Sequence, residues 1–193
     1  MRLLIFILLF SLGADAQIIR ANPFYRSINT SAPYCSDSDA EAFIVATGIT
    51  DGTQKDAICN LVQDLKDSSL WSSLLAIYPF VGGTATTHKF NLKNPANTDA
   101  AYRLTFSGTW THSSNGADPN GINAYANTYY APSANATATS RHISFYSMED
   151  VQTGRDIGSS DGSYNGDLFH IEYSDGNTYG QIGSRDGSAT AGN

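Results

Sequence analysis

The chain has 193 residues and a formal net charge of -7, and only 15% of its residues are charged, against about 25% in an average soluble domain. Its 11 Lys and Arg residues are too few for the clustered positive surface that binds nucleic-acid phosphates or anionic membranes. Hydrophobic residues make up 41% of the chain, which excludes a compositionally disordered protein. Composition therefore predicts one folded, acidic domain that binds no nucleic acid.

Residues 1–16 have the pattern of a secretory signal peptide. A positive start at Met1-Arg2 precedes an apolar run over 3–12 and the small-x-small motif Ala14-Asp15-Ala16. The run is about ten residues long, half of the roughly 20 that a membrane-spanning helix needs, and no later segment approaches that length. We expect cleavage before Gln17, export, and no membrane span after signal removal. The alternative is an uncleaved signal anchor.

The chain has two cysteines, Cys35 and Cys59. Export would place them in an oxidising compartment, where two cysteines more often pair than stay free. Neither lies in a Cys-x-x-Cys motif or next to a histidine in sequence, so nothing indicates a zinc site or a thiol nucleophile. We predict a Cys35–Cys59 disulfide, no metal and no cofactor.

A helical segment is expected over 36–75, after an irregular leader over 17–35. Its first helix begins at the capping-box pattern Ser38-Asp39-Ala40-Glu41 and stops at Gly48. A second helix begins near Asp51. Its apolar residues follow the i, i+3, i+4, i+7 spacing of one helical face: Ile58, Leu61, Val62 and Leu65. The disulfide would clamp these two helices together.

Residues 76–193 are predicted to form an antiparallel β-sandwich, because short alternating runs follow one another between Gly, Asn, Asp and Ser turns. From Tyr102 to His112 the residues alternate with a period of two, which indicates one strand with one apolar face that includes Trp110 as a core residue. Asp175-Gly176 is typical of a two-residue hairpin turn. Folding about it places these residues on one face: Phe169, Ile171, Tyr173, Thr178, Gly180 and Ile182.

The heptapeptide Ile157–Ser163 recurs, with one substitution, at Ile182–Ser188. A strand is expected from Leu168 after the first copy, and the same shift places the next strand at residue 193, the last of the sequence. We therefore expect the sandwich to be incomplete at its C-terminal end. A truncated reading frame, a fragment or a partner chain that supplies the missing strands would explain this, and chance repetition of a turn-rich sequence is the alternative.

No catalytic spacing is visible in the sequence, so we predict a protein that is not an enzyme and has no catalytic residue. The histidines are scattered singly, at His88, His112, His142 and His170, and His112 is expected to have a structural role. Glu149 and Asp150 are adjacent and would point to opposite faces of a strand, and Glu172 has no acidic residue two positions away, so paired glycosidase carboxylates are missing. The loop 161–167 offers three carboxylate or amide side chains, Asp161, Asn165 and Asp167; a turn is expected there, with a calcium site near Asp161 as the alternative.

Tyr125, Asn127 and Tyr129 fall on one face of a short expected strand, with Tyr130 on the other. Ligand sites combine aromatic rings with a few well-placed polar groups such as amides. We therefore predict that these three residues bind a glycan or another cell-surface receptor.

Two regions carry a resemblance to known proteins. Residues 76–95, with the runs AIYPFVGG and HKFNLKNP, and residues 105–128, with TFSGTWTHSS, NG and YANT, resemble a region of poorly characterised phage and metagenomic structural proteins with a concanavalin-A-like or laminin-G-like jelly roll. The similarity covers roughly residues 37–147 and carries no catalytic residue. It implies a mainly β, antiparallel jelly-roll sandwich behind the helical segment.

The resemblance further implies a non-catalytic structural or adhesive module of a phage virion or tail. Such a module would contact a cell-surface glycan or neighbouring virion and coat subunits, and would lie at the virion surface or outside the cell. A secreted soluble lectin is the alternative function, followed by a glycoside hydrolase or polysaccharide lyase.

Overall fold

A computed structural model describes residues 32–131, 142–146, 153–159, 168–174 and 177–183. Contacts divide the chain into two units, Met1–Tyr34 and Cys35–Asn193, and the helices and strands described below belong to the second. The predicted signal peptide and most of the predicted leader lie outside the described residues. Within the described part, no helix is long and apolar enough to cross a membrane.

Helix α2 (Ser38–Thr47) begins and ends at well-formed caps. Asp37 is its N-cap, and its carboxylate accepts hydrogen bonds from the N–H groups of Asp39 at 2.9 Å and Ala40 at 3.3 Å. Gly48 ends the helix with a φ of 66°, in the left-handed region that glycine adopts without strain. The predicted stop is confirmed, but the predicted capping box is wrong by one residue, since Asp37 replaces Ser38 as the cap.

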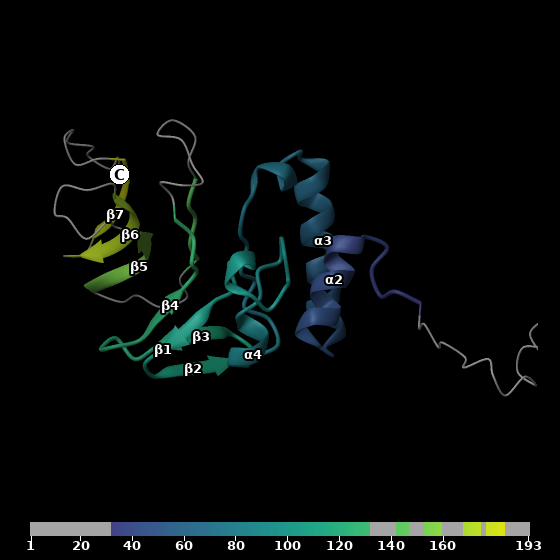
Figure 1. Ribbon diagram of the computed structural model, residues 1–193, viewed down its shortest axis with the longest axis horizontal. Coiled ribbons are helices and arrows are strands. Elements are labelled where there is room, and N and C mark those ends of the chain that lie inside the picture. Colours follow the sequence, from purple (N-terminus) through teal and green to yellow (C-terminus); the bar gives the residue numbers. More distant parts are fainter. Residues whose placement is uncertain (1–31, 132–141, 147–152, 160–167, 175–176, 184–193) are drawn as a thin grey trace, which may run out of the picture. The chain divides into compact units, whose positions relative to one another are not determined.

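Helix α3 (Gly52–Asp67) packs beside α2 (Figure 1). Its N-cap is Asp51, whose carboxylate accepts from the N–H of Gln54 at 2.8 Å, so the predicted start is confirmed. Of the predicted apolar stripe, Ile58 and Val62 are buried, and Leu61 and Leu65 are half-buried. The stripe therefore does face the protein interior.

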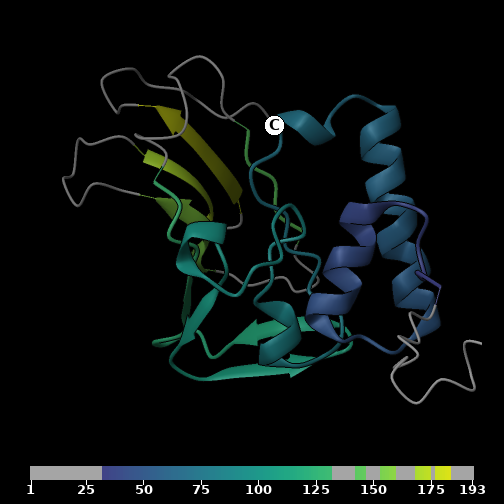
Figure 2. The same cartoon turned by 45° about the vertical axis from the view of Figure 1, so that its right-hand side comes forward.

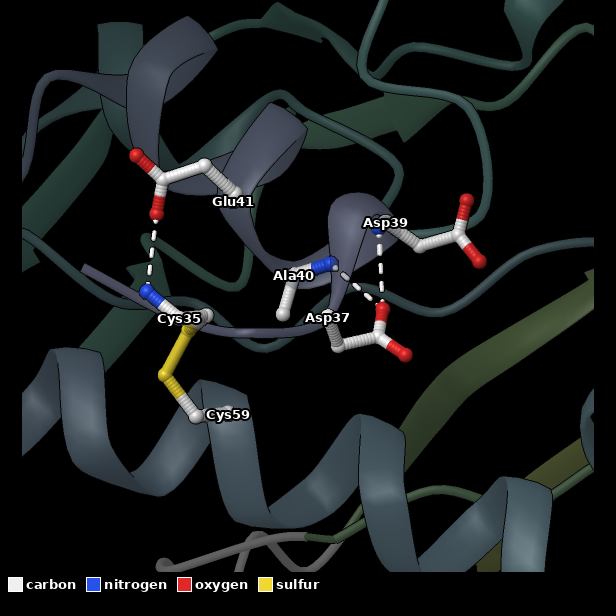
Figure 3. Close-up of a disulfide and its surroundings, with 6 residues drawn as sticks. All are labelled: Cys35, Asp37, Asp39, Ala40, Glu41 and Cys59. Atoms are coloured by element: carbon white, nitrogen blue, oxygen red, sulfur yellow. Dashed lines mark hydrogen bonds between the residues drawn. A yellow bond between two sulfur atoms is a disulfide. The ribbon is translucent and has the colours of Figure 1, made fainter. Parts of the chain in front are cut away.

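The predicted disulfide between Cys35 and Cys59 is present and joins the start of α2 to the middle of α3, with 5.8 Å between the Cα atoms (Figure 3). Glu41 accepts the N–H of Cys35 at 3.0 Å. The ammonium of Lys66, on α3, lies 2.6 Å from a carboxylate oxygen of Asp37, and this hydrogen bond lowers the pKa of Asp37. A covalent bond and an ion pair thus fix the two helices to each other.

The hydrophobic core lies between the two helices and the segment that follows them. Phe43, Ile58 and Val62 are at most 2% exposed, and burial of each stabilises the fold by about 2 kcal/mol relative to an exposed side chain. Phe90 and Leu92 join this core from further along the chain. The buried members of the cluster are Cys35, Ala40, Phe43, Ile44, Ile49, Ile58, Val62, Phe90 and Leu92.

Residues 71–104 are helical or irregular, where β-structure was expected from residue 76 onward. They contain the 3₁₀ helices η1 (Trp71–Ser73) and η2 (Asp99–Ala101) and the short helix α4 (Ala85–His88). The fully buried side chain of Asn91 organises this segment. Its Oδ1 accepts from the N–H groups of Ile77 and Lys93, and its Nδ2 donates to the carbonyls of Leu75 and Ala101. One amide side chain therefore satisfies backbone groups that a strand partner would otherwise bind.

The described strands form three small antiparallel sheets. β1 (Thr105–Ser107) pairs with β4 (Tyr125–Asn127), and β2 (Trp110–Ser113) pairs with β3 (Gly116–Pro119). Helix α4 packs against β3 (Figure 2). The third sheet has the order β5-β6-β7 and consists of β5 (Thr153–Ser159), β6 (Leu168–Ser174) and β7 (Asn177–Gly183).

The predicted antiparallel jelly-roll β-sandwich is wrong: the described residues form no sandwich and no jelly roll. The period of two from Tyr102 to His112 spans two strands in different sheets. Tyr102 is in the left-handed conformation at the end of η2, with φ 57°. Gly108 has φ 76°, and a Cβ atom there would overlap the carbonyl of Asn123. The chain therefore turns at Gly108, and β1 and β2 find separate partners.

The β6–β7 hairpin has the predicted register. Ser174 pairs with Asn177, which leaves the two predicted turn residues, Asp175 and Gly176, between the strands and outside the described residues. The predicted facing pairs are confirmed as Cα partners: Phe169 with Ile182, Ile171 with Gly180, and Tyr173 with Thr178. The two copies of the heptapeptide begin at the ends of β5 and β7, and the rest of each copy lies outside the described residues.

Candidate functional site

Strand β4 carries two of the predicted ligand-binding residues, Tyr125 and Asn127, and the third, Tyr129, follows two residues after the strand ends; we call these three residues the tyrosine face. The side chain of Tyr125 is 62% exposed and that of Tyr129 is 41% exposed. Asn127, between them, is also exposed, whereas Ala126 and Tyr130 are half-buried. All three predicted residues are therefore exposed, and their role in binding stays a prediction.

Pairing and hydrogen bonds hold the tyrosine face in place. In the β1–β4 ladder, Thr105 is opposite Asn127. Tyr129 has φ 58°, a conformation that costs a bulky residue about 1–2 kcal/mol. Its N–H donates to Oδ1 of Asn127 at 2.8 Å, and its hydroxyl donates to Oγ1 of Thr105 at 3.1 Å. These two bonds offset the strain and fix the Tyr129 ring before any ligand arrives.

The structure brings together two histidines that are 24 residues apart in sequence, His88 at the end of α4 and His112 in β2. Their Nδ1 atoms are 2.9 Å apart, and His88 is only 1% exposed. The N–H of Gly83 donates to Nε2 of His88 at 3.2 Å. Because Nε2 accepts, the proton of neutral His88 is assigned to Nδ1, which donates to His112 and leaves the His112 proton on Nε2.

Both histidines are neutral at neutral pH. Burial, with a contribution from His112, lowers the pKa of His88 to about 4, and burial also lowers the pKa of His112. The pair presents an Nε2–H donor on His112 and no free imidazole lone pair, so it is not arranged as a general base. Aromatic rings surround it, with Phe80 5.5 Å from His88 and Phe106 4.7 Å from His112 between ring centroids. This is the geometry of a packed structural contact.

Sequence reasoning missed this pair, because its two members come from a helix and a strand that meet only in the fold.

Trp110, expected in the core, is half-buried and donates its indole N–H to the carbonyl of Ser107 at 2.9 Å. Its ring stacks near His112, 6.2 Å between centroids. Trp110 was predicted to be a core residue, but it is half-buried and lies beside His112 at the edge of the aromatic group around the histidine pair.

A hollow of about 450 Å³ lies between the α2–α3 connection and the glycine loop before α4. Oε1 of Gln54 accepts the N–H of Gly82 at 2.9 Å and ties its two walls together. Asp51 is the one charged residue of its lining. The remaining lining residues are small or hydroxyl-bearing for the most part: Gly48, Ile49, Thr50, Gln54, Gly82, Thr84, Thr87 and Ser114.

Among the described side chains, no group of three or more His, Cys, Asp or Glu residues is placed to hold a metal ion. The loop 161–167, where calcium was the alternative to a turn, lies outside the described residues, as do Glu149 and Asp150. Glu172 is in β6 opposite Arg155 of β5, in a part of the sheet where the structure describes the backbone alone.

No protein-family model matches the chain, and comparison with curated proteins and with solved structures gave no match. The resemblance to phage and metagenomic jelly-roll proteins gains no support from these comparisons. The function is therefore argued from the geometry of the described residues.

Proposed function

We propose that this chain is an exported, non-catalytic module that binds a glycan through the tyrosine face. The observation that carries the proposal is the pair of exposed rings, Tyr125 in β4 and Tyr129 just after it, on either side of the exposed amide of Asn127 in sequence. Aromatic rings offer apolar faces to the C–H surface of a sugar, and an amide binds its hydroxyl groups. A preordered ring at Tyr129 reduces the entropy lost on binding.

Asn127 supports the same proposal. Its Oδ1 is used by the N–H of Tyr129, whereas its Nδ2 donates to no atom in the described part of the chain. The exposed NH₂ group of Asn127, whose amide is fixed by its bond to Tyr129, is available to donate hydrogen bonds to a sugar hydroxyl.

Two features support export. Residues 1–16 have the signal-peptide pattern, and the Cys35–Cys59 disulfide is of the kind that persists in oxidising compartments. The same tyrosine face would serve a soluble lectin or an adhesive subunit of a virion. Fractionation of the producing culture separates these settings, because a virion subunit sediments with particles and a lectin stays in the supernatant.

The proposal excludes turnover of the glycan. The His88–His112 pair uses its lone pairs internally, and the carboxylate Asp51 of the larger hollow caps α3 through one oxygen. Neither arrangement supplies the acid and base pair that glycoside hydrolysis needs.

A glycan array probed with the mature protein, residues 17–193, tests the proposal. We expect binding to at least one glycan, and Tyr125→Ala is expected to weaken it about tenfold, the loss of one stacking contact. Tyr146→Ala is the matched control, because Tyr146 is 85% exposed but lies outside the tyrosine face. Absence of binding to any glycan, equal binding by the Tyr125→Ala variant, or release of shortened glycans would contradict the proposal.

A further inference from the structure

A second, smaller hollow of about 310 Å³ adjoins the tyrosine face. Thr105 connects the two: it lines this hollow, and its Oγ1 accepts a hydrogen bond from the hydroxyl of Tyr129 at 3.1 Å. Thr105 and Asn127 are Cα partners in an antiparallel pair, so their side chains share one face of the β1–β4 ladder. The hollow is lined by Ala85, Thr86, Lys89, Arg103, Leu104, Thr105 and Phe106. A ligand on the tyrosine face therefore reaches the mouth of the hollow.

The charge of the hollow is opposite to that of the protein. Lys89 and Arg103 both line it, although the chain has 11 Lys and Arg against 18 Asp and Glu. Arg103 is bound to Asp99 at 2.9 Å, so its charge is largely compensated. Lys89 contacts the ring of Phe90, with its ammonium 5.1 Å from the centroid, and no carboxylate among the described residues forms an ion pair with it. The hollow thus has a net positive charge from Lys89.

A backbone hydrogen bond holds the main chains of the two cationic residues next to each other. Lys89 follows α4, and its carbonyl accepts the N–H of Leu104, next to Arg103, at 2.8 Å. The preceding helix is closed by a reciprocal capping box between Thr84 and Thr87. Lys89 and Arg103 therefore flank the hollow as parts of one hydrogen-bonded frame.

We propose that this hollow binds the acidic group of a glycan, a carboxylate or a sulfate ester, while a ring of the same glycan contacts Tyr129. The inference rests on the proposed function and narrows its ligand class to acidic saccharides such as uronate or sulfated oligomers. A volume of about 310 Å³ is at the lower end of ligand pockets, which suits one substituted sugar unit. Lys89 supplies the point charge. The Arg103 guanidinium is held in place by Asp99 and by Asn97, whose Oδ1 accepts from Nη1 of Arg103 at 3.1 Å, so its role in the site is secondary to that of Lys89.

Titration calorimetry with the mature protein tests the inference, with oligogalacturonate and a sulfated galactose oligomer compared with the neutral galactose oligomer and with inorganic sulfate. We expect both acidic oligomers to bind more tightly than the neutral one. Lys89→Gln keeps the length of the stem and removes the charge, and it is expected to weaken acidic binding about tenfold. Lys89→Arg is the matched control and is expected to retain binding.

The possible outcomes separate this inference from the proposed function. Equal binding of neutral and acidic oligomers, weakened by Tyr125→Ala but unaffected by Lys89→Gln, would overturn the acidic site and leave glycan binding intact. Inorganic sulfate that binds as tightly as the sulfated oligomer would also overturn it, because the hollow would then be an anion site independent of the glycan. Failure of both acidic oligomers to bind would overturn the acidic site, whereas only the absence of binding to every glycan of the array would overturn the proposed function as well.

Discussion

Mild acid is expected to destabilise the protein through the buried His88–His112 pair. Burial lowers the pKa of His88 from 6.5 to about 4, so between these values the unfolded chain binds a proton that the folded protein does not. Because the unfolded state binds more protons, the free energy of unfolding falls as the pH falls, by about 1.4 kcal/mol per pH unit for each such proton. The contribution of His88 is fully present above pH 6.5 and is lost toward pH 4.

When the pH is lowered from 7.5 to 5.0, His88 is expected to reduce the free energy of unfolding by about 2 kcal/mol. The lowered pKa of His112 acts in the same direction. Most carboxylates titrate below this pH range, so the histidines account for most of the pH dependence of the free energy of unfolding within it.

Urea unfolding followed by tryptophan fluorescence at several pH values measures the effect. His88→Gln removes the titrating ring and keeps a side-chain oxygen that can accept the Gly83 N–H. In this variant the number of protons taken up on unfolding is expected to be about one lower than in the wild type. His142→Gln, a change at an exposed histidine outside the buried pair, is the matched control variant. An identical pH dependence in the wild type and in His88→Gln would refute the assignment of this proton to His88.

Two further predictions concern the fold. Reduction of the Cys35–Cys59 disulfide, which closes a loop with a sequence separation of 24, should lower the free energy of unfolding by about 3 kcal/mol; an unchanged urea midpoint in dithiothreitol would contradict this. Gly108→Ala should cost more than about 2 kcal/mol, because a left-handed φ is combined with overlap at Asn123. Gly121→Ala is its control, since Gly121 has a similar φ of 67° with open space around it, and equal losses in the two variants would show that the overlap is unimportant.

The helices were predictable because their signals are local. The Asp51 cap, the Gly48 stop and the apolar stripe of α3 all act within one helix or its ends. The same holds for the β6–β7 hairpin, whose two strands are neighbours in sequence and pair from Ser174 and Asn177 onward. The shared side of Tyr125 and Asn127 was predictable for a similar reason, because alternation along one short strand decides which side chains share a side.

The jelly roll was predicted wrongly because the features that decide the observed fold are long-range contacts and local backbone conformations. The alternation from Tyr102 to His112 is real, but Tyr102 ends η2 ahead of the first strand, and the positive φ of Gly108 divides the remaining residues between two sheets. The buried amide of Asn91 binds backbone groups on both sides of it in sequence, and no spacing rule reveals that role. The His88–His112 contact and the cationic hollow likewise depend on segments that meet only after folding.

The central claim is that the tyrosine face binds a glycan, and an NMR titration tests it most directly. Backbone amide shifts of the mature, ¹⁵N-labelled protein would be followed while the best-binding glycan of the array is added. We predict perturbations at Tyr125–Tyr130 and in β1, extending to Lys89 and Arg103 for an acidic glycan. Perturbations confined to the larger hollow, at Gly48–Asp51 and Gly82–Thr84, or an unchanged spectrum at saturating glycan, would contradict the account.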